Sequence, residues 1–195
     1  MGRWNPHVSV AGLVLVFLGS CSSQSLPGST PHPALRAGQP VAPALLGLAL
    51  GPGQALPACA GQAEPAQACS EPVAKGSDMH TVQLAALARM DGVHRRASAL
   101  QLGNALESIS VQIDGAPALQ ALPGVLDQLC GPPSFDSRMQ LDGGGQLWSM
   151  AWQCSDGMVQ LNAVQHEAMA QAALSVTTER GQQWFEGGDS LALAD

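Results

Sequence analysis

Side chains with catalytic or metal-binding chemistry are few and scattered in this sequence. Beyond the first thirty residues the histidines are His32, His80, His94 and His166, and no HExxH motif contains any of them. Asp78 and His80 would point the same way on a strand and could then bind a metal or share a proton. A solvated pair at the exit of a loop is the favoured interpretation, and His166 with Glu167 is interpreted as solvated too.

Two further features invite a catalytic or anion-binding interpretation. Gly143-Gly144-Gly145 lacks the lysine and the following helix of a phosphate-binding loop, which favours a hairpin tip. The only basic cluster is Arg89, His94, Arg95 and Arg96, which we interpret as a solvated face rather than a site for an acidic partner or a lipid head group. No GxSxG motif is present, and no carboxylate pair can be nominated, because glycosidase carboxylates meet in space rather than along the chain.

The most distinctive apolar feature is a stripe formed by Trp148, Met150 and Trp152. Their spacing of two places all three on one face of a strand. The favoured interpretation is a core face. The alternative is an open ligand or partner face, since tryptophan is common at binding hot spots.

Charge and composition exclude one class of partner. The 195-residue chain has 15 Asp and Glu against 8 Lys and Arg, a net charge of −7. A chain this acidic repels phosphate backbones, so we expect no nucleic-acid binding. The sequence also gives no reason to expect a cofactor or a metal.

The first 21 residues have the layout of an export signal. Arg3 is followed by the apolar run Val8 to Leu18, which is too short to span a bilayer. The segment ends in Leu18-Gly19-Ser20-Cys21. This tetrapeptide resembles the lipobox of bacterial lipoproteins, in which a branched apolar residue and two small residues precede an obligatory cysteine.

The resemblance implies an address as well as a modification. In the lipoprotein class, cleavage leaves Cys21 as an N-terminus that carries diacylglyceryl and acyl chains, including palmitate, and several chains together hold a protein stably on a membrane. Ser22, where an Asp would signal retention at the inner membrane, favours the outer membrane facing the periplasm. The alternatives are an ordinary signal peptide with a chance cysteine and a retained signal anchor.

Composition divides the chain into four segments. Residues 1–20 are the predicted signal peptide. Residues 21–43 are a lipidated cysteine and a Pro-, Ser- and Gly-rich tether, for which an ordered N-terminal extension is the alternative. Residues 44–179 form a single folded domain, and residues 180–195 a polar tail that docks or frays.

Within the domain, apolar alternation predicts several strands. Leu46, Leu48 and Leu50 indicate a first short strand before a Gly-Pro-Gly turn, and residues 109–113 indicate a half-buried strand. Residues 81–102 fit either a strand or a helix. Leucines 119, 122, 126 and 129 predict a helix that ends at Gly131, and that either kinks at Pro123 or begins there.

Four more strands are expected after the helix, over residues 134–141, 147–154, 158–164 and 172–178. Turn signals at residues 142–145 and 155–157 separate the first three, and a looser link at 165–171 precedes the last. The predicted fold is α+β: an antiparallel meander sheet with one main helix packed on one face.

The remaining cysteines are Cys59, Cys69, Cys130 and Cys154, an even number that fits two disulfides in an exported chain. Three pairings are possible. We favour Cys59 with Cys69, which closes one loop, and Cys130 with Cys154, which ties the helix end to a strand. A redox pair or a zinc site is the alternative, but no CxxC motif occurs.

These observations favour a membrane-anchored envelope lipoprotein that is not an enzyme and that binds or helps to assemble another envelope protein. A small-ligand-binding lipoprotein is the second hypothesis, and it requires a pocket at Trp148 and Trp152. An envelope hydrolase is the third, and it requires a histidine such as His80 or His166 beside a carboxylate.

Overall fold

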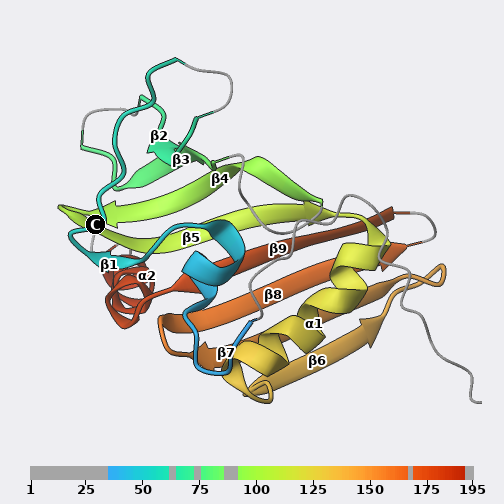
Figure 1. Cartoon of the computed structure of the whole chain (residues 1–195). Coiled ribbons are helices and arrows are strands. Elements are labelled where there is room, and N and C mark those ends of the chain that lie inside the picture. The colour runs from blue at the N-terminus through green and yellow to red at the C-terminus, as the bar shows by residue number, and fades with distance from the viewer. Residues whose placement is uncertain (1–34, 62–64, 73–75, 86–91, 167–168, 192–195) are drawn as a thin grey trace, which may run out of the picture. The chain divides into compact units, whose positions relative to one another are not determined.

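The computed structural model describes residues 35–61, 65–72, 76–85, 92–166 and 169–191, which belong to one compact unit. They form an α+β domain, an antiparallel sheet with a helix packed on it (Figure 1). Its strands are β1 (Gly51–Pro52), β2 (Cys69–Ser70), β3 (Met79–Gln83), β4 (Val93–Leu102), β5 (Ala105–Asp114), β6 (Phe135–Gln140), β7 (Gln146–Cys154), β8 (Gly157–His166) and β9 (Met169–Thr177). The predicted fold class is confirmed.

The strands lie in the order β2-β3-β4-β5-β9-β8-β7-β6, with β1 paired to β5. Strands β6 to β9 are joined by successive hairpins and form the expected meander. The pairing of β5 with β9 joins this meander to the first half of the chain, and α1 carries the chain from β5 to the far edge, where β6 begins (Figure 1).

Alternation along the strands separates two faces. On β5 the side chains of Ile109, Val111 and Ile113 are fully or almost fully buried, and their partners on β9 and β8 are equally buried. These apolar residues all point toward α1 (Ala116–Cys130), which packs across β5, β9 and β7. Their removal from water, at about 25 cal/mol per Å², is the main term that holds the helix to the sheet.

Helix α1 has the predicted apolar face and the predicted end. Leu119, Leu122, Leu126 and Leu129 are buried, and the Gly131 N–H donates to the Asp127 carbonyl at 2.9 Å. The helix begins at Ala116, so Pro123 lies inside it instead of starting it.

The first predicted strand is wrong. Residues Ala42–Leu46 form a short π-helical segment, η1, and the left-handed Gly47 (φ 71°) ends it. Four of its five residues are buried, because both sides of this turn pack into the core, and alternating leucines do not distinguish that environment from a strand. Only Gly51–Pro52 pairs with the sheet, as β1.

The last residues of the predicted tether belong to this packing. Val41 is fully buried, the Gly38 N–H donates to the Leu129 carbonyl at 2.8 Å, and Asp156 accepts the Ala42 N–H at 2.8 Å. Ordered structure therefore begins before residue 44. The signal segment and residues 21–34 lie outside the described residues.

Three other segments differ from the sequence prediction or resolve an ambiguity in it. The ambiguous stretch 81–102 contributes β3 and β4. The link between the last two strands is shorter than expected, since β8 ends at His166 and β9 begins at Met169. The tail that was expected to be merely polar forms helix α2 (Glu179–Leu191).

Both predicted disulfides are present. Cys59 and Cys69 are joined with their Cα atoms 5.0 Å apart, and Cys130 and Cys154 with their Cα atoms 4.8 Å apart. The first closes the loop beside β2, and the second fixes the end of α1 to the end of β7.

Candidate functional site

The Trp148, Met150 and Trp152 stripe lies on the face of β7 that α1 covers. Trp152 is fully buried and Met150 is 4% exposed, while Trp148 is half-buried with Arg138 over its ring. The Trp152 indole N–H donates to the Asp127 carboxylate of α1 at 2.8 Å, the bond that a buried indole requires. Met150 and Trp152 therefore belong to the core, and Trp148, which is half-buried, packs against it.

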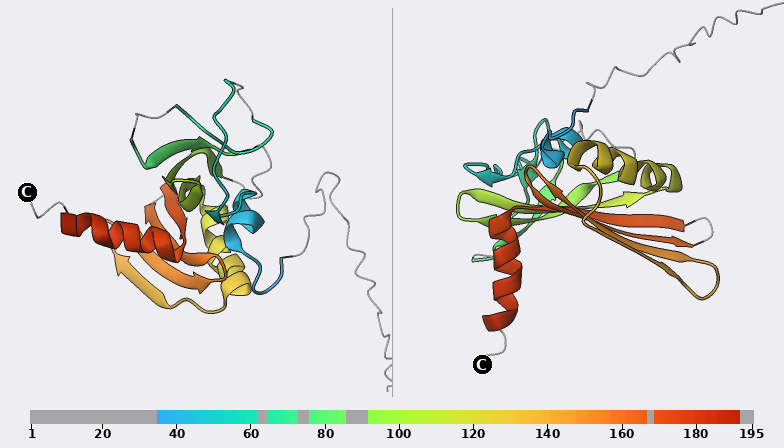
Figure 2. Two further views of the ribbon diagram at one scale, coloured as in Figure 1. Left: turned by 90° about the vertical axis from the view of Figure 1, so that its left-hand side faces the viewer. Right: turned by 90° about the horizontal axis from the view of Figure 1, so that it is seen from below.

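The opposite face of the sheet is not covered by α1. Figure 2 shows α1 and η1 on one side of the sheet and α2 projecting from the other. The outward positions of the strands carry small uncharged polar side chains in rows that cross neighbouring strands. One row contains Gln160, Ser175, Ser110, Ser98 and Thr81.

A neighbouring row on this open face reaches α2. It contains Met158, Thr177, Ser108, Leu100 and Met79. Beyond it, Phe185 and Glu186 of α2 complete the wall of a partly open groove of about 470 Å³. The groove floor contains serine and threonine hydroxyl groups together with Leu100 and Gln160, and methionine and phenylalanine side chains lie at its rim.

The floor is preorganised by hydrogen bonds between its own side chains. Ser108 bonds to Thr177 at 2.8 Å, and Ser175 donates to Ser110 at 3.0 Å. A hydroxyl has one donor and two acceptor positions, so each pair keeps acceptor capacity for a bound group. The floor can therefore form hydrogen bonds through uncharged groups, while Glu186 places one carboxylate in the groove wall.

Helix α2 is held beside the groove by a buried carboxylate on β5. Glu107 is 2% exposed; one of its oxygens accepts a short bond from the Thr178 hydroxyl and the other is 3.3 Å from Arg180. The Thr178 hydroxyl in turn accepts the Gly181 N–H at 3.1 Å, which caps the helix N-terminus. Glu107 thus sets the direction in which α2 leaves the sheet.

The open face continues toward the other end of the strands. A second hollow of about 250 Å³ is lined by Gln112, Asn162, Leu147 and Val164 among others. Asp114 marks the border of the face and contacts His94 at 2.6 Å. Across β5, β9 and β8 the described outward positions between these borders carry no charged side chain, and Arg96 lies at the β4 border, on the same face as Ser98.

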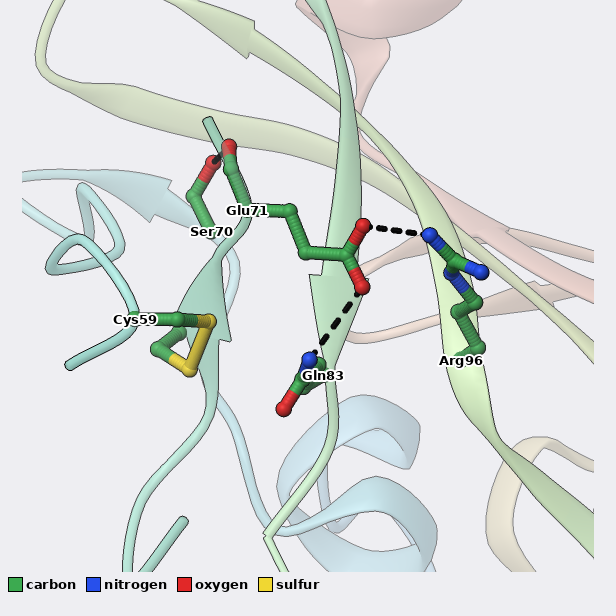
Figure 3. A network of polar contacts seen from close by, with 6 residues as sticks. Cys59, Ser70, Glu71, Gln83 and Arg96 are labelled. Atoms are coloured by element: carbon green, nitrogen blue, oxygen red, sulfur yellow. Dashed lines mark hydrogen bonds and ion pairs between the residues drawn. A yellow bond between two sulfur atoms is a disulfide. The ribbon is translucent and has the colours of Figure 1, made fainter. Parts of the chain in front are cut away.

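Two members of the predicted basic cluster, His94 and Arg96, are paired with carboxylates. Arg96 donates to Glu71 at 2.6 Å, and Gln83 donates to the other oxygen of the same carboxylate at 3.2 Å (Figure 3). The hydrogen bond from Arg96 holds the pKa of Glu71 below its ordinary value. His94 faces Asp114, and Arg89 lies outside the described residues.

The remaining candidate residues do not assemble into a catalytic site. His80 bonds through Nδ1 to the Ser70 hydroxyl at 2.9 Å rather than to a carboxylate. His166 packs on the glycine loop, where a Cβ at Gly145 would lie 2.9 Å from its ring. The three glycines form the predicted hairpin tip between β6 and β7, and Glu167 lies outside the described residues.

Among the described residues, no three His, Cys, Asp or Glu side chains gather closely enough to hold a metal ion. Within the same part of the chain, no helix has the length and apolar character needed to cross a membrane. No family model, curated protein or solved structure matches the chain.

The sequence patterns did not predict the open face, because the strands were assigned from their apolar positions and the outward positions were not compared between strands. The signal of the open face is nevertheless in the sequence, at the positions between the apolar ones. Ser110 and Gln112 alternate with the buried residues of β5, Gln160 and Asn162 with those of β8, and Ser175 with those of β9. A solvated sheet face ordinarily carries many charges, so their absence from the outward positions of β5, β9 and β8 between Ser108 and Gln112 is the informative feature.

Proposed function

We propose that this chain is a lipid-anchored, non-enzymatic protein of the bacterial envelope that binds another envelope protein on the open face of its sheet. The anchor is the lipidated Cys21, and the expected location is the outer membrane, on its periplasmic side. The Leu18-Gly19-Ser20-Cys21 motif and a domain with two disulfides both fit an exported chain.

The observation that carries the binding role is the composition of the open face. The centres of protein interfaces are depleted of charged residues and enriched in methionine and aromatic residues. The rows of the open face contain serine, threonine and glutamine, and Met79, Phe135 and Met139 stand exposed at its margins. The low charge of the central rows and the exposed Met79, Phe135 and Met139 match an interface. The serines do not, because serine is depleted at interfaces, so the apolar margins carry the argument.

A protein partner also fits the form of the groove. The groove beside α2 is partly open and continues into the rest of the face, so an elongated surface can lie along it. Phe185 is 44% exposed at its rim and can act as an apolar anchor.

A small ligand in the groove is the second candidate. Its volume of about 470 Å³ lies within the usual range of ligand sites. Trp184 is adjacent to Phe185, with the two ring centroids 5.1 Å apart, so its fluorescence would report a ligand bound there. The predicted pocket at Trp148 and Trp152 is replaced in this hypothesis by the groove at α2.

Hydrolase chemistry has less support. It would require a histidine that is poised by a carboxylate and faces a nucleophile or a metal. The described histidine with a carboxylate partner is His94, and its pair with Asp114 is almost half exposed on both sides, at 44% and 47%.

The binding role can be tested by placing a charge on the open face. Gln160→Arg introduces a guanidinium at an exposed position on the groove floor, and Gln120→Arg makes the same change on the exposed side of α1. The full chain and both variants would be expressed with a C-terminal tag, cross-linked in intact cells, and purified from solubilised envelopes.

We expect one envelope protein to co-purify with the native chain and with Gln120→Arg, and its yield to fall severalfold with Gln160→Arg. Circular dichroism would establish that both variants fold. Equal yields from the two variants would exclude the open face as the binding surface. Absence of a partner from every sample, with the groove responding to metabolites through Trp184 fluorescence, would favour the small-ligand hypothesis.

A further inference from the structure

Strand β6 forms one edge of the sheet and is exposed along its whole length. It pairs with β7 on one side, and all six of its residues are exposed. In Figure 1 its outer edge borders no other labelled element. An edge of this kind presents unpaired backbone N–H and C=O groups to any strand that approaches.

The hydrogen-bond pattern shows which groups face outward. The Leu141 N–H donates to the Gly145 carbonyl at 2.7 Å, and the β6–β7 register continues without interruption to Phe135. Backbone groups alternate in direction along a strand. Those of Phe135, Ser137 and Met139 therefore face β7, and those of Asp136 and Arg138 face the free edge.

The charges on this edge are complementary to themselves. If two copies of β6 pair antiparallel about a twofold axis at Ser137, Asp136 of each copy lies opposite Arg138 of the other. Phe135 then lies opposite Met139 on the open face. A register slip of one residue, which moves the axis to a point between two residues, would place side chains of different faces opposite each other.

In the two nearest alternative registers, residues of the same sheet face still lie opposite each other, but like charges are paired. An axis at Asp136 places two aspartates opposite each other, and an axis at Arg138 places two arginines opposite each other. Like charges directly across a strand pair are destabilising, and opposite charges are stabilising. One register is thus selected by the sequence Phe135-Asp136-Ser137-Arg138-Met139.

We propose that two copies of this chain associate through their β6 edges, in antiparallel register about Ser137, to form one continuous sheet. This goes beyond the proposed binding function and does not depend on it. Pairing joins the open faces of the two copies into a single surface, and Phe135 and Met139, which are 53% and 58% exposed in one copy, cover each other at the junction.

Within one chain, Arg138 already forms a two-pronged contact with Asp136, at 3.2 and 3.3 Å. These charges can instead serve to protect the edge from pairing. The two roles predict different results from charge reversal. Under the protective role the edge stays charged in either variant and no association is gained by mixing them, whereas under complementarity each variant associates weakly alone and the mixture recovers dimers.

The charge test uses the full chain in detergent and measures its self-association by sedimentation. Asp136→Arg places arginines opposite arginines, and Arg138→Asp places aspartates opposite aspartates. Each variant alone should associate on the order of tenfold more weakly than the native chain. An equimolar mixture should recover dimers, because every cross-strand pair is then of opposite charge.

Recovery in the mixture cannot arise from contacts within one chain. A native chain that sediments as a monomer at every concentration tested would overturn the proposal and assign the charges to edge protection. Dimers that both variants retain unchanged would place the contact elsewhere on the molecule, which also overturns it.

Cross-linking in cells tests the register. In the proposed pairing the two Ser137 residues form a non-hydrogen-bonded pair with Cα atoms about 4.5 Å apart. Ser137→Cys should then form a disulfide-linked dimer on mild oxidation. Ser149→Cys, its neighbour on β7, is the matched control, because two such residues would be roughly 14 Å apart, beyond disulfide reach. Equal cross-linking of the two variants, or none from Ser137→Cys, would contradict the register.

Discussion

Replacement of Asp127 by alanine tests how α1 is fixed to the sheet. Trp152 is fully buried, and its indole N–H has the Asp127 carboxylate as its partner at 2.8 Å. A buried donor that loses its partner costs about 1–3 kcal/mol. Because the side chain of Asp127 is itself exposed, water can approach the vacated position, which places the expected loss at about 1–2 kcal/mol.

The assay is equilibrium unfolding in urea with the disulfides intact, followed by circular dichroism. With a slope of about 2 kcal/mol per molar urea, the Asp127→Ala midpoint should fall by about 0.5–1 M. Asp127→Asn is the matched control, since its amide oxygen can still accept the indole bond while the charge is absent. Its midpoint should stay closer to that of the native chain.

A midpoint for Asp127→Ala equal to that of the native chain would refute the reasoning, because it would mean that the indole bond contributes nothing measurable. Equal losses in Asp127→Ala and Asp127→Asn would refute it differently. They would assign the effect to the charge of the carboxylate rather than to its acceptor atom.

Three further predictions concern stability. Removing the Cys130–Cys154 disulfide by a double alanine substitution should lower the free energy of unfolding by roughly 3 kcal/mol, measured in urea, and an unchanged value would contradict its structural role. Gly157→Ala should destabilise the domain by more than about 2 kcal/mol, because a Cβ there would lie 2.1 Å from a carbonyl oxygen of Thr177 at a φ of 129°, and a thermal midpoint within 2 °C of native would argue against this strain. The pKa of Glu71 is lowered in the folded state, so the ionised carboxylate stabilises the fold above about pH 4.5, and this stabilisation is lost as the pH falls. The difference in free energy of unfolding between the native chain and Glu71→Gln should therefore shrink between about pH 7 and pH 3. A difference that stays constant over this range would contradict the ion pair.

The meander could be predicted because each of its strands has one buried face and clear turns. The stripe from Trp148 to Trp152 and the residues of β8 alternate strictly, and Asp156-Gly157 marks the hairpin between them. The disulfide pairing followed from the same layout, since the predicted helix ends at Cys130 and the predicted strand ends at Cys154.

The two elements that the sequence did not predict, η1 and α2, lack a clear contrast between a buried apolar face and an exposed polar face. In η1 nearly every residue is buried, so its leucines carry no helical period. In α2 the residues are mostly polar, and the helix depends on a tertiary contact with Glu107 that no local pattern reveals. A local signal was present all the same, because Thr178 precedes Glu179 in the manner of an N-cap.

The candidate site was missed for a related reason. The features that predict a site from sequence are catalytic or metal-binding side chains and clusters of large apolar side chains. The open face has neither at its centre; it is defined by uncharged side chains such as Ser110 and Gln160 that share a face only after β5, β9 and β8 pair. The pairing of β5 with β9 joins residues as far apart in the sequence as Ser110 and Ser175, which periodicity within one segment cannot foresee.

The most direct test of the proposed function is photo-cross-linking in intact cells from single positions of the full chain. A photoreactive amino acid would replace Gln160 on the open face or Gln120 on the exposed side of α1. We predict that one envelope protein is captured from position 160 and not from position 120. Capture of the same protein from both positions, or from position 120 alone, would contradict a binding role for the open face.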